Sequence, residues 1–351
     1  MQRVTHAAIP SPTTAVWHLG ALPVRAYALC IVAGIVIACV VTERRLRRQG
    51  ALPWAVLDVA VWAVPFGVVG ARLYHVLTSW SDYFGYNGDP VRALYIWEGG
   101  LGIWGAVAGG AVGAWLGCRQ VGIPLRVFAD ALAVGLPLAQ AVGRLGNWFN
   151  NELHGGPTTL AWGLRVHVMD RVNPGQALRG PDGDPVTLPG LYHPTFLYEA
   201  LWNVGVAVLV LVVGGRLRLG RGRAFALYVV GYTVGRCWIE MMRVDPAPVV
   251  LGARLNVWTS LLVLAGALAY LVLVRGPQEF LLPRAGDGGG YEVVGEDTYR
   301  ARTAAADPAH QVPGPTDGAT PPVTAAGRGT AASRARDAVV DEAEDRPDEP
   351  R

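Results

Sequence analysis

The chain alternates between long apolar stretches and shorter polar segments. Seven apolar stretches stand out along it, each close to the ~20 residues that cross a bilayer as a helix. The pattern therefore predicts an all-α polytopic membrane protein with seven transmembrane helices. The predicted spans cover residues 22–42, 54–77, 99–118, 124–142, 195–214, 224–243 and 254–274.

The segments outside these spans differ in character. Residues 143–194 are rich in Gly, Pro, Asp and His and are too long for a simple connection, so we expect them to form a small external cap. Residues 276–351 contain few large apolar side chains after Tyr299, and such a segment cannot offset its ordering entropy by burial. The predicted organisation is an external N-terminal segment (1–21), a seven-span membrane domain (22–275) and a disordered cytoplasmic tail (276–351).

Composition supports the membrane class. The chain is 52% hydrophobic and 16% charged, whereas soluble domains carry about 25% charged residues. The net charge is +3, and there is no basic stripe with interleaved aromatic residues, so nucleic-acid binding is not indicated. The four cysteines lie in or beside apolar runs without metal-ligand spacing, so we expect neither a metal site nor a cofactor.

Basic residues in the connections fix the orientation. With seven alternating spans, four groups of arginines fall on one side, which is cytoplasmic by the positive-inside rule. The N-terminus is then outside and the C-terminus inside a bacterial cytoplasmic membrane that the chain crosses several times. Inside the spans, glycines recur at Gly105, Gly109 and Gly113, a spacing that favours close packing of helices within one bundle.

The outer side holds the polar residues that indicate chemistry. The segment 143–152 reads GRLGNWFNNE and directly follows an apolar span. A guanidinium is a planar, permanently charged donor suited to a phosphodiester, so Arg144 is a candidate for binding an anionic lipid headgroup. Asn147 and Asn150 could add neutral donors, and Glu152 could orient an arginine or move a proton. The asparagines also suit an ordinary helix end and turn, and both interpretations stay open.

A second polar group lies in the outer half of the sixth predicted span. Arg236 and Glu240 are four residues apart and Arg243 is seven residues from Arg236, so all three share one helix face. An arginine inside a span costs about 2.5–3.5 kcal/mol at the helix centre, which favours a functional role. The alternative is an internal ion pair with an arginine that reaches the interface.

A third group, His193, Tyr198 and Glu199, stands where the fifth predicted span begins on the outer side, and Tyr27 begins the first. An unpaired Glu199 inside the membrane would be costly, so we expect Arg236 or Arg243 to pair with it. For Tyr27 the alternative role is anchoring at the membrane interface.

These residues together resemble the bacterial prolipoprotein diacylglyceryl transferases over most of residues 20–275. Segment 143–155 is similar to the family's most specific signature; further matches are Tyr27, His193, Pro194, Tyr198, Glu199, Tyr232, Gly235, Arg236, Glu240 and Arg243.

The resemblance implies seven spans and a catalytic domain at 22–275. It implies transfer of the diacylglyceryl group of phosphatidylglycerol to the lipobox cysteine in a prolipoprotein signal peptide, which forms a thioether and releases glycerol phosphate. The expected catalytic residues are Tyr27, Arg144, Glu152, Arg236 and Glu240. The residues expected to bind phosphatidylglycerol are Arg144, Asn147, Asn150, His193, Tyr232, Arg236 and Arg243.

One position departs from the family. Its members commonly carry a histidine, proposed as the base, where this chain has Trp104, and an indole cannot accept a proton. The proton acceptor is left open among Tyr27, Glu98, Glu152, His154 and Glu240. Two rival functions are a transporter or channel for an anionic substrate, which would favour internal repeats and broken helices, and a scaffold that presents its tail to partners.

Overall fold

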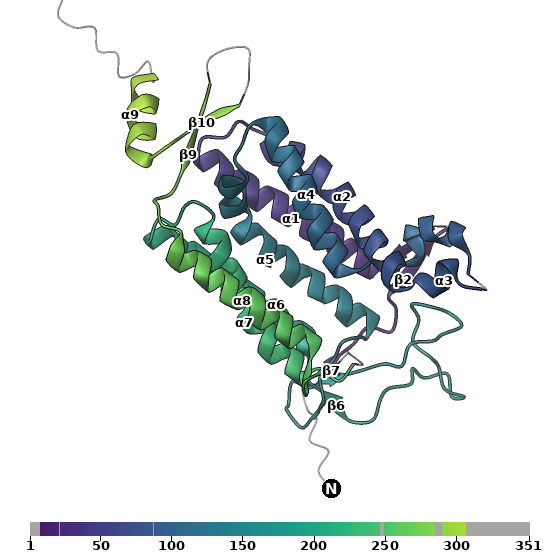
Figure 1. The fold of residues 1–351 in the computed structure, drawn as a ribbon. Coiled ribbons are helices and arrows are strands. Elements are labelled where there is room, and N and C mark those ends of the chain that lie inside the picture. The colour runs from purple at the N-terminus through teal and green to yellow at the C-terminus, as the bar shows by residue number, and fades with distance from the viewer. Residues whose placement is uncertain (1–7, 21, 87, 246–248, 285–289, 307–351) are drawn as a thin grey trace, which may run out of the picture. The chain divides into compact units, whose positions relative to one another are not determined.

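The computed structural model describes residues 8–20, 22–86, 88–245, 249–284 and 290–306. Most of these residues are helical (Figure 1). The long helices are α1 (Ala26–Arg48), α2 (Ala55–Thr78), α4 (Ile103–Val121), α5 (Leu125–Asn150), α6 (Thr195–Leu209, continued by a π-helical turn, Val210–Gly214), α7 (Arg223–Met242) and α8 (Leu255–Leu273). Short helices are α3 (Trp80–Phe84), η1 (Pro90–Leu94), η2 (Ile96–Glu98) and α9 (Glu296–Ala306).

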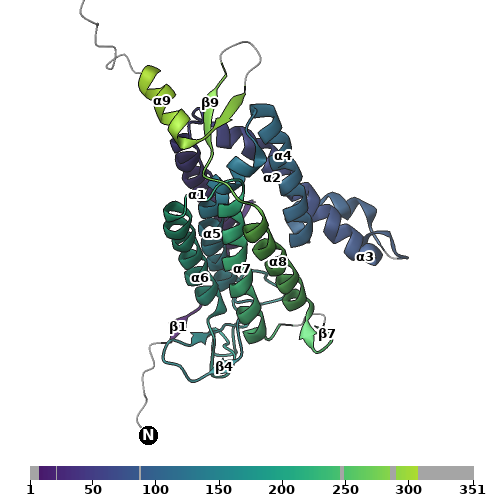
Figure 2. The same ribbon diagram turned by 60° about the vertical axis from the view of Figure 1, so that its left-hand side comes forward.

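Helix α5 occupies the centre of the bundle. It packs against α1, α6 and α7, while α7 also packs against α8 (Figure 2). Helix α5 is accordingly the most buried of the long apolar helices. Its residues Ala133 and Val134 are essentially inaccessible and pack with Val206, Ala207 and Tyr228 of α6 and α7. The position of α5 matters because its last turns carry the signature segment.

Helices α2 and α4 form a separate tight pair. A Cβ added at Gly105 would lie 2.1 Å from the carbonyl oxygen of Gly70, and one at Gly113 would lie 2.5 Å from that of Trp62. Only glycine permits this approach, because a Cβ atom would overlap the facing backbone. The prediction that the glycine row packs helices within one bundle is confirmed.

Five helices of the described residues are long and apolar enough to cross a membrane: α1, α2, α5, α6 with its π-helical turn, and α8. Large apolar side chains point outward from them, as Val61 at 70% exposed and Leu262 at 75% show. Such surfaces suit contact with lipid. The chain is therefore a multi-pass membrane protein. Helices α4 and α7 fall outside this set; α4 is rich in glycine, and α7 carries Arg236 and Glu240.

The cap differs in its boundaries from the sequence prediction. Helix α5 continues to Asn150, so residues 143–150 belong to the bundle, and the first helix begins at Ala26 rather than at residue 22. The N-terminal strand β1 (Ile9–Pro10) joins the cap sheet, in the order β1-β5-β6-β4 with β4 (Pro157–Thr158), β5 (Leu164–Arg165) and β6 (Leu191–Tyr192). Residues 8–12 are therefore part of the cap. Two short hairpins lie elsewhere: β2 (Val16–Leu19) pairs with β3 (Leu22–Arg25), and β7 (Val249–Val250) pairs with β8 (Ala253–Arg254).

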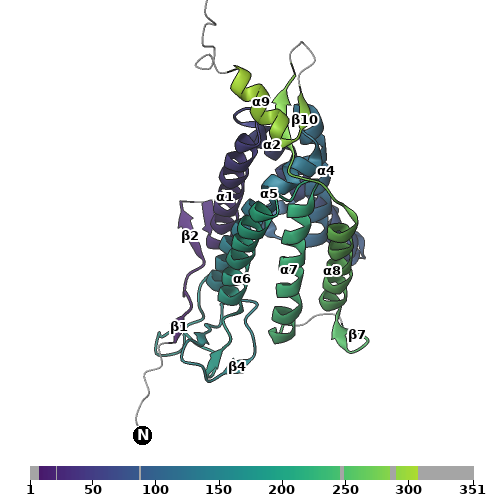
Figure 3. The ribbon, with the colours of Figure 1, turned by 90° about the vertical axis from the view of Figure 1, so that its left-hand side faces the viewer.

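The C-terminal segment also differs from the prediction. Disorder was expected from residue 276, but β9 (Phe280–Pro283) and β10 (Tyr291–Val294) form an antiparallel hairpin at the end of the helices opposite the cap (Figure 3). Leu281 is fully buried against residues that include Leu46 and Val59, and the Tyr291 hydroxyl accepts a hydrogen bond from the backbone N–H of Leu52 at 2.9 Å. The prediction was wrong for this stretch because a few apolar side chains find a ready surface on the bundle. Residues 307–351 lie outside the described residues.

Candidate active site

The signature segment forms the last turns of α5 and the residues just beyond them. The helix ends at Asn151, which adopts the left-handed conformation at φ 56°, one that asparagine tolerates better than most residues. The Asn151 amide donates to the carbonyl of Pro12 at 2.8 Å and accepts from the backbone N–H of His167 at 2.8 Å. Asn151 therefore fixes the helix end to the N-terminal segment and the cap.

Asn147 and Asn150 converge on one carboxylate. Each side-chain amide donates to Oε1 of Glu152 at 3.1 Å. Asn147 is buried at 6% exposed, whereas Glu152 is exposed. The spacing of three residues places both amides on one face of α5, and the turn at Asn151 brings Glu152 back to them. These asparagines thus hold Glu152, in addition to ending the helix.

Tyr27 joins this group from α1. A Cβ added at Gly146 would lie 2.4 Å from the Tyr27 ring, so the ring rests directly on the α5 backbone. The Tyr27 hydroxyl is within electrostatic range of both Glu152 and Arg144. The glycine at position 146 of the signature is therefore required for a steric reason, because it leaves room for the Tyr27 ring beside the charged residues.

Glu199 links two helices through a pair of arginines. It lies near the start of α6 and is 6% exposed. Its Oε2 is 2.5 Å from Nε of Arg144, and its Oε1 is 3.5 Å from a terminal nitrogen of Arg236. We expected Arg236 or Arg243 to pair with Glu199, and Arg236 does so. Arg144 is a second partner that the sequence did not predict. Two guanidinium groups from distant parts of the chain thus meet at one buried carboxylate.

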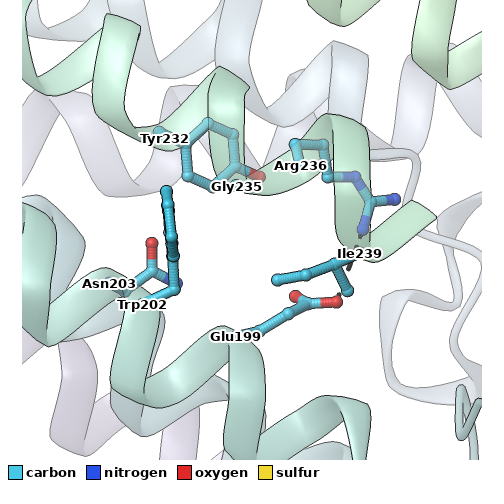
Figure 4. A pocket seen from close by; sticks show the side chains of 7 residues that line it. All are labelled: Glu199, Trp202, Asn203, Tyr232, Gly235, Arg236 and Ile239. Atoms are coloured by element: carbon cyan, nitrogen blue, oxygen red, sulfur yellow. Dashed lines mark ion pairs between the residues drawn. The ribbon is translucent and has the colours of Figure 1, made fainter. Parts of the chain in front are cut away.

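A small pocket lies beside this bridge, between α6 and α7 (Figure 4). Its lining residues are Glu199, Trp202, Asn203, Tyr232, Gly235, Arg236 and Ile239. A Cβ at Gly235 would lie 2.1 Å from Nε1 of Trp202, so this glycine allows the indole to cover the pocket. Among the described residues, the Arg236 nitrogen nearest Glu199 is buried without a hydrogen-bond partner. That nitrogen is held beside Glu199 by charge, at 3.5 Å, and not by a hydrogen bond.

Glu240 is the most enclosed carboxylate of the cluster, with no exposed side-chain surface. Its Oε2 is 2.7 Å from Arg236, and its Oε1 is 3.1 Å from Nε of Arg254 and accepts from the Asn256 amide at 3.0 Å. A buried carboxylate is tolerated only with such compensation. The shared helix face of Arg236 and Glu240 is confirmed, and the two form the ion pair that the alternative interpretation gave. Arg254 and Asn256 were missed.

Arg243 and Arg254 enclose a further carboxylate, Asp245. Nε and one terminal nitrogen of Arg243 bind its two oxygens at 2.7 and 3.0 Å, and Arg254 binds it at 2.9 Å. Burial acts to raise the pKa of Asp245, but the hydrogen bonds and charges of both arginines outweigh it and hold the pKa below its usual range. Arg254 comes just before the last predicted span, on the side that the charge rule predicts to be outer. An arginine at such a position was the signal that could have found it.

His193 connects the third sequence group to the signature. Its backbone carbonyl accepts from the N–H of Gly155 at 3.0 Å, and its Nδ1 lies 3.3 Å from the Tyr198 hydroxyl. Trp104 lies on the first turn of α4, the helix that pairs with α2. The groups predicted from sequence around Arg144, Arg236 and Tyr27 therefore meet at one end of the bundle.

Together these features define a multi-pass membrane protein with an arginine-lined polar site at the end of its helices that carries the cap. The family model of the prolipoprotein diacylglyceryl transferases matches residues 14–273, and the chain belongs to this family. Three relatives carry the name phosphatidylglycerol–prolipoprotein diacylglyceryl transferase, the third with the suffix 2.

The relative from Frankia alni is 56% identical over 271 residues, which cover 77% of this chain and 68% of the relative. That from Mycobacteroides abscessus is 53% identical over 290 residues, 80% of this chain and 82% of the relative. That from Streptomyces coelicolor is 57% identical over 268 residues, 76% of this chain and 81% of the relative.

Proposed function

We propose that this chain transfers the diacylglyceryl group of phosphatidylglycerol to the lipobox cysteine of prolipoproteins, forming a thioether and releasing glycerol phosphate. Family membership supplies the reaction and the two substrates. The observation in the site that carries the proposal is the Glu199 bridge, which holds Arg144 and Arg236 together at one end of the bundle. A transporter or channel for an anionic substrate is not favoured by the family names.

The topology follows the arginine pattern. We take α4 and α7 as spans beside the five apolar helices, which gives seven, with a cap joined by the N-terminal segment. The N-terminus and cap then face the outside of the bacterial cytoplasmic membrane, and the C-terminus is cytoplasmic. The polar residues of α7 are tolerated because Glu199, Glu240 and their arginines neutralise one another within the bundle.

The charge balance of the site suits the donor lipid. The ion-paired set joins four arginines (Arg144, Arg236, Arg243, Arg254) to three carboxylates (Glu199, Glu240, Asp245), which leaves one positive charge. Phosphatidylglycerol carries a single negative charge on its phosphodiester. Arg144 and Arg236 are the residues that we assign to this phosphate, because their guanidinium groups meet at Glu199 beside the pocket.

The chemistry requires a substitution at carbon. The cysteine thiolate attacks the glyceryl carbon that bears the phosphate, the S–C bond forms, and the C–O bond breaks with its electron pair on the phosphate oxygen. The leaving glycerol phosphate gains a second negative charge. Guanidinium groups held in a site of low dielectric stabilise that developing charge more than water does. Glu240 keeps Arg236 oriented, and Tyr232 lines the pocket beside it.

Glu152 is the residue that we assign to accept the thiol proton. Glu199 and Glu240 are buried and each is engaged by two or more guanidinium groups, whereas Glu152 is exposed and can pass a proton to water. Asn147 and Asn150 orient it, and the Tyr27 hydroxyl lies within range of its charge. This assignment needs no histidine at position 104.

The remaining assigned residues act at the rim of the site. Arg243 supports the phosphate site by its charge, since its Nε and one terminal nitrogen already bind Asp245. His193 holds Gly155 and Tyr198 where the signature meets α6, and can reach the lipid headgroup from there.

The test uses the purified full chain in phosphatidylglycerol nanodiscs with a lipobox peptide, analysed by mass spectrometry. We expect a diacylglyceryl mass gain for the wild type and none for Arg144→Ala or Arg236→Ala, both still folded. Arg171→Ala, an exposed arginine in the cap, is the matched control and keeps full activity. No mass gain for the wild type would overturn the proposed reaction. Wild-type rates in both variants would overturn the phosphate site.

A further inference from the structure

Arg254 differs from the arginines assigned to the lipid phosphate, because both of its terminal nitrogens already donate hydrogen bonds to protein groups. One terminal nitrogen donates to the backbone carbonyls of Glu240 and Arg243 at 3.2 and 3.0 Å. The other binds the carbonyl and the side chain of Asp245 at 2.8 and 2.9 Å, and Nε faces Glu240 at 3.1 Å. Arg254 therefore binds protein groups on all sides of its guanidinium.

These contacts divide the two oxygens of Glu240. Arg254 and Asn256 occupy Oε1, and Arg236 lies at Oε2. If Oε1 were vacant, the buried carboxylate would attract Arg236 with both oxygens, since a guanidinium prefers a bidentate carboxylate. Arg236 would then turn away from Glu199 and from the pocket. The division of Glu240 is what leaves the other terminal nitrogen of Arg236 directed at Glu199, beside the pocket.

We infer that Arg254 and Asn256, at the start of α8, are positioning residues that set the orientation of Arg236 through Glu240. Arg254 also ties the C-terminal end of α7 to the start of α8, because it binds the carbonyls of Glu240 and Arg243. Neither residue contacts the lipid in this proposal. The inference rests on the proposed function, since its readout is diacylglyceryl transfer.

The experiment measures three single variants, Arg254→Gln, Asn256→Ala and Glu240→Gln, in nanodiscs of varied phosphatidylglycerol content. It also measures the two double variants that combine Glu240→Gln with Arg254→Gln or with Asn256→Ala. Arg254→Gln should lower kcat/KM for phosphatidylglycerol at least 20-fold and Asn256→Ala about fivefold, while KM for the peptide stays within twofold. Each double variant should be no worse than Glu240→Gln alone, because residues that act through one another are not additive. Arg171→Gln is the matched control and retains wild-type constants.

The milder Asn256→Ala variant keeps the test decisive if Arg254→Gln does not fold. Effects that multiply in the double variants, or a rise in KM for the peptide alone, would overturn the positioning role. Wild-type constants in both single variants would overturn it too. An inactive wild type would instead reject the proposed function, so the two failures are distinguishable.

Discussion

The substitution Glu199→Gln tests the bridge at the centre of the site. Glu199 is 6% exposed and its oxygens lie 2.5 and 3.5 Å from Arg144 and Arg236. Removing one partner of a buried ion pair lowers the free energy of unfolding by about 3–5 kcal/mol. Because glutamine keeps one acceptor oxygen, we expect a loss at the lower end of this range, about 3 kcal/mol. The two guanidinium groups would also repel each other and lose their shared orientation.

Activity should fall along with stability. Loss of preorganised donors to a developing negative charge costs about 100- to 1,000-fold in rate, and we expect about 100-fold here, equal to ~2.7 kcal/mol. Rates come from mass spectrometry of the lipidated peptide, and stability from thermal unfolding of the protein in detergent.

Glu279→Gln is the matched control for this substitution. Glu279 pairs with the half-exposed Arg126 at 2.9 Å, and such a surface pair contributes about 0–1 kcal/mol. The control should therefore keep its activity and lose little stability. If Glu199→Gln and Glu279→Gln behaved alike in both assays, the reasoning about the buried bridge would be refuted.

Two further predictions concern the signature and the cap. Gly146→Ala places a Cβ 2.4 Å from the Tyr27 ring and should lower the rate of transfer at least tenfold. In the control Gly143→Ala the added Cβ meets nothing within 4 Å, so its rate should match the wild type. Equal rates in the two variants would contradict the steric role of Gly146. Partial burial lowers the pKa of His167 in the folded protein below its ordinary value of 6.5. The stability that depends on neutral His167 is therefore complete above pH 6.5 and declines as the pH falls through the pKa of the folded state. Protection factors of the cap amides, which correct for the intrinsic pH dependence of exchange, should fall at pH 5 relative to pH 8, and should fall less in His167→Gln. The same fall in that variant would contradict the role of His167.

The sequence predicted the site better than its surroundings. Helical spacing placed Arg236 and Glu240 on one helix face. Glu199 was expected to pair with Arg236 or Arg243, because a buried carboxylate needs a partner. Arg254 was missed because it lies fourteen residues after Glu240 and no helical spacing links the two. They meet only because α7 packs against α8. Asp245 was missed because its role depends on that same packing.

Apolar stretches, positive-inside charges and the signature segment determined the class, the order of the long helices and the residue types of the site. These features are local, because a bilayer requires each span to satisfy its own backbone hydrogen bonds. Only the tertiary structure decided that Arg144 and Arg236 meet at Glu199, that Gly146 makes room for Tyr27, and that the C-terminal hairpin folds onto the bundle. These contacts join residues far apart in the chain, and how distant helices pack is not encoded in any short segment.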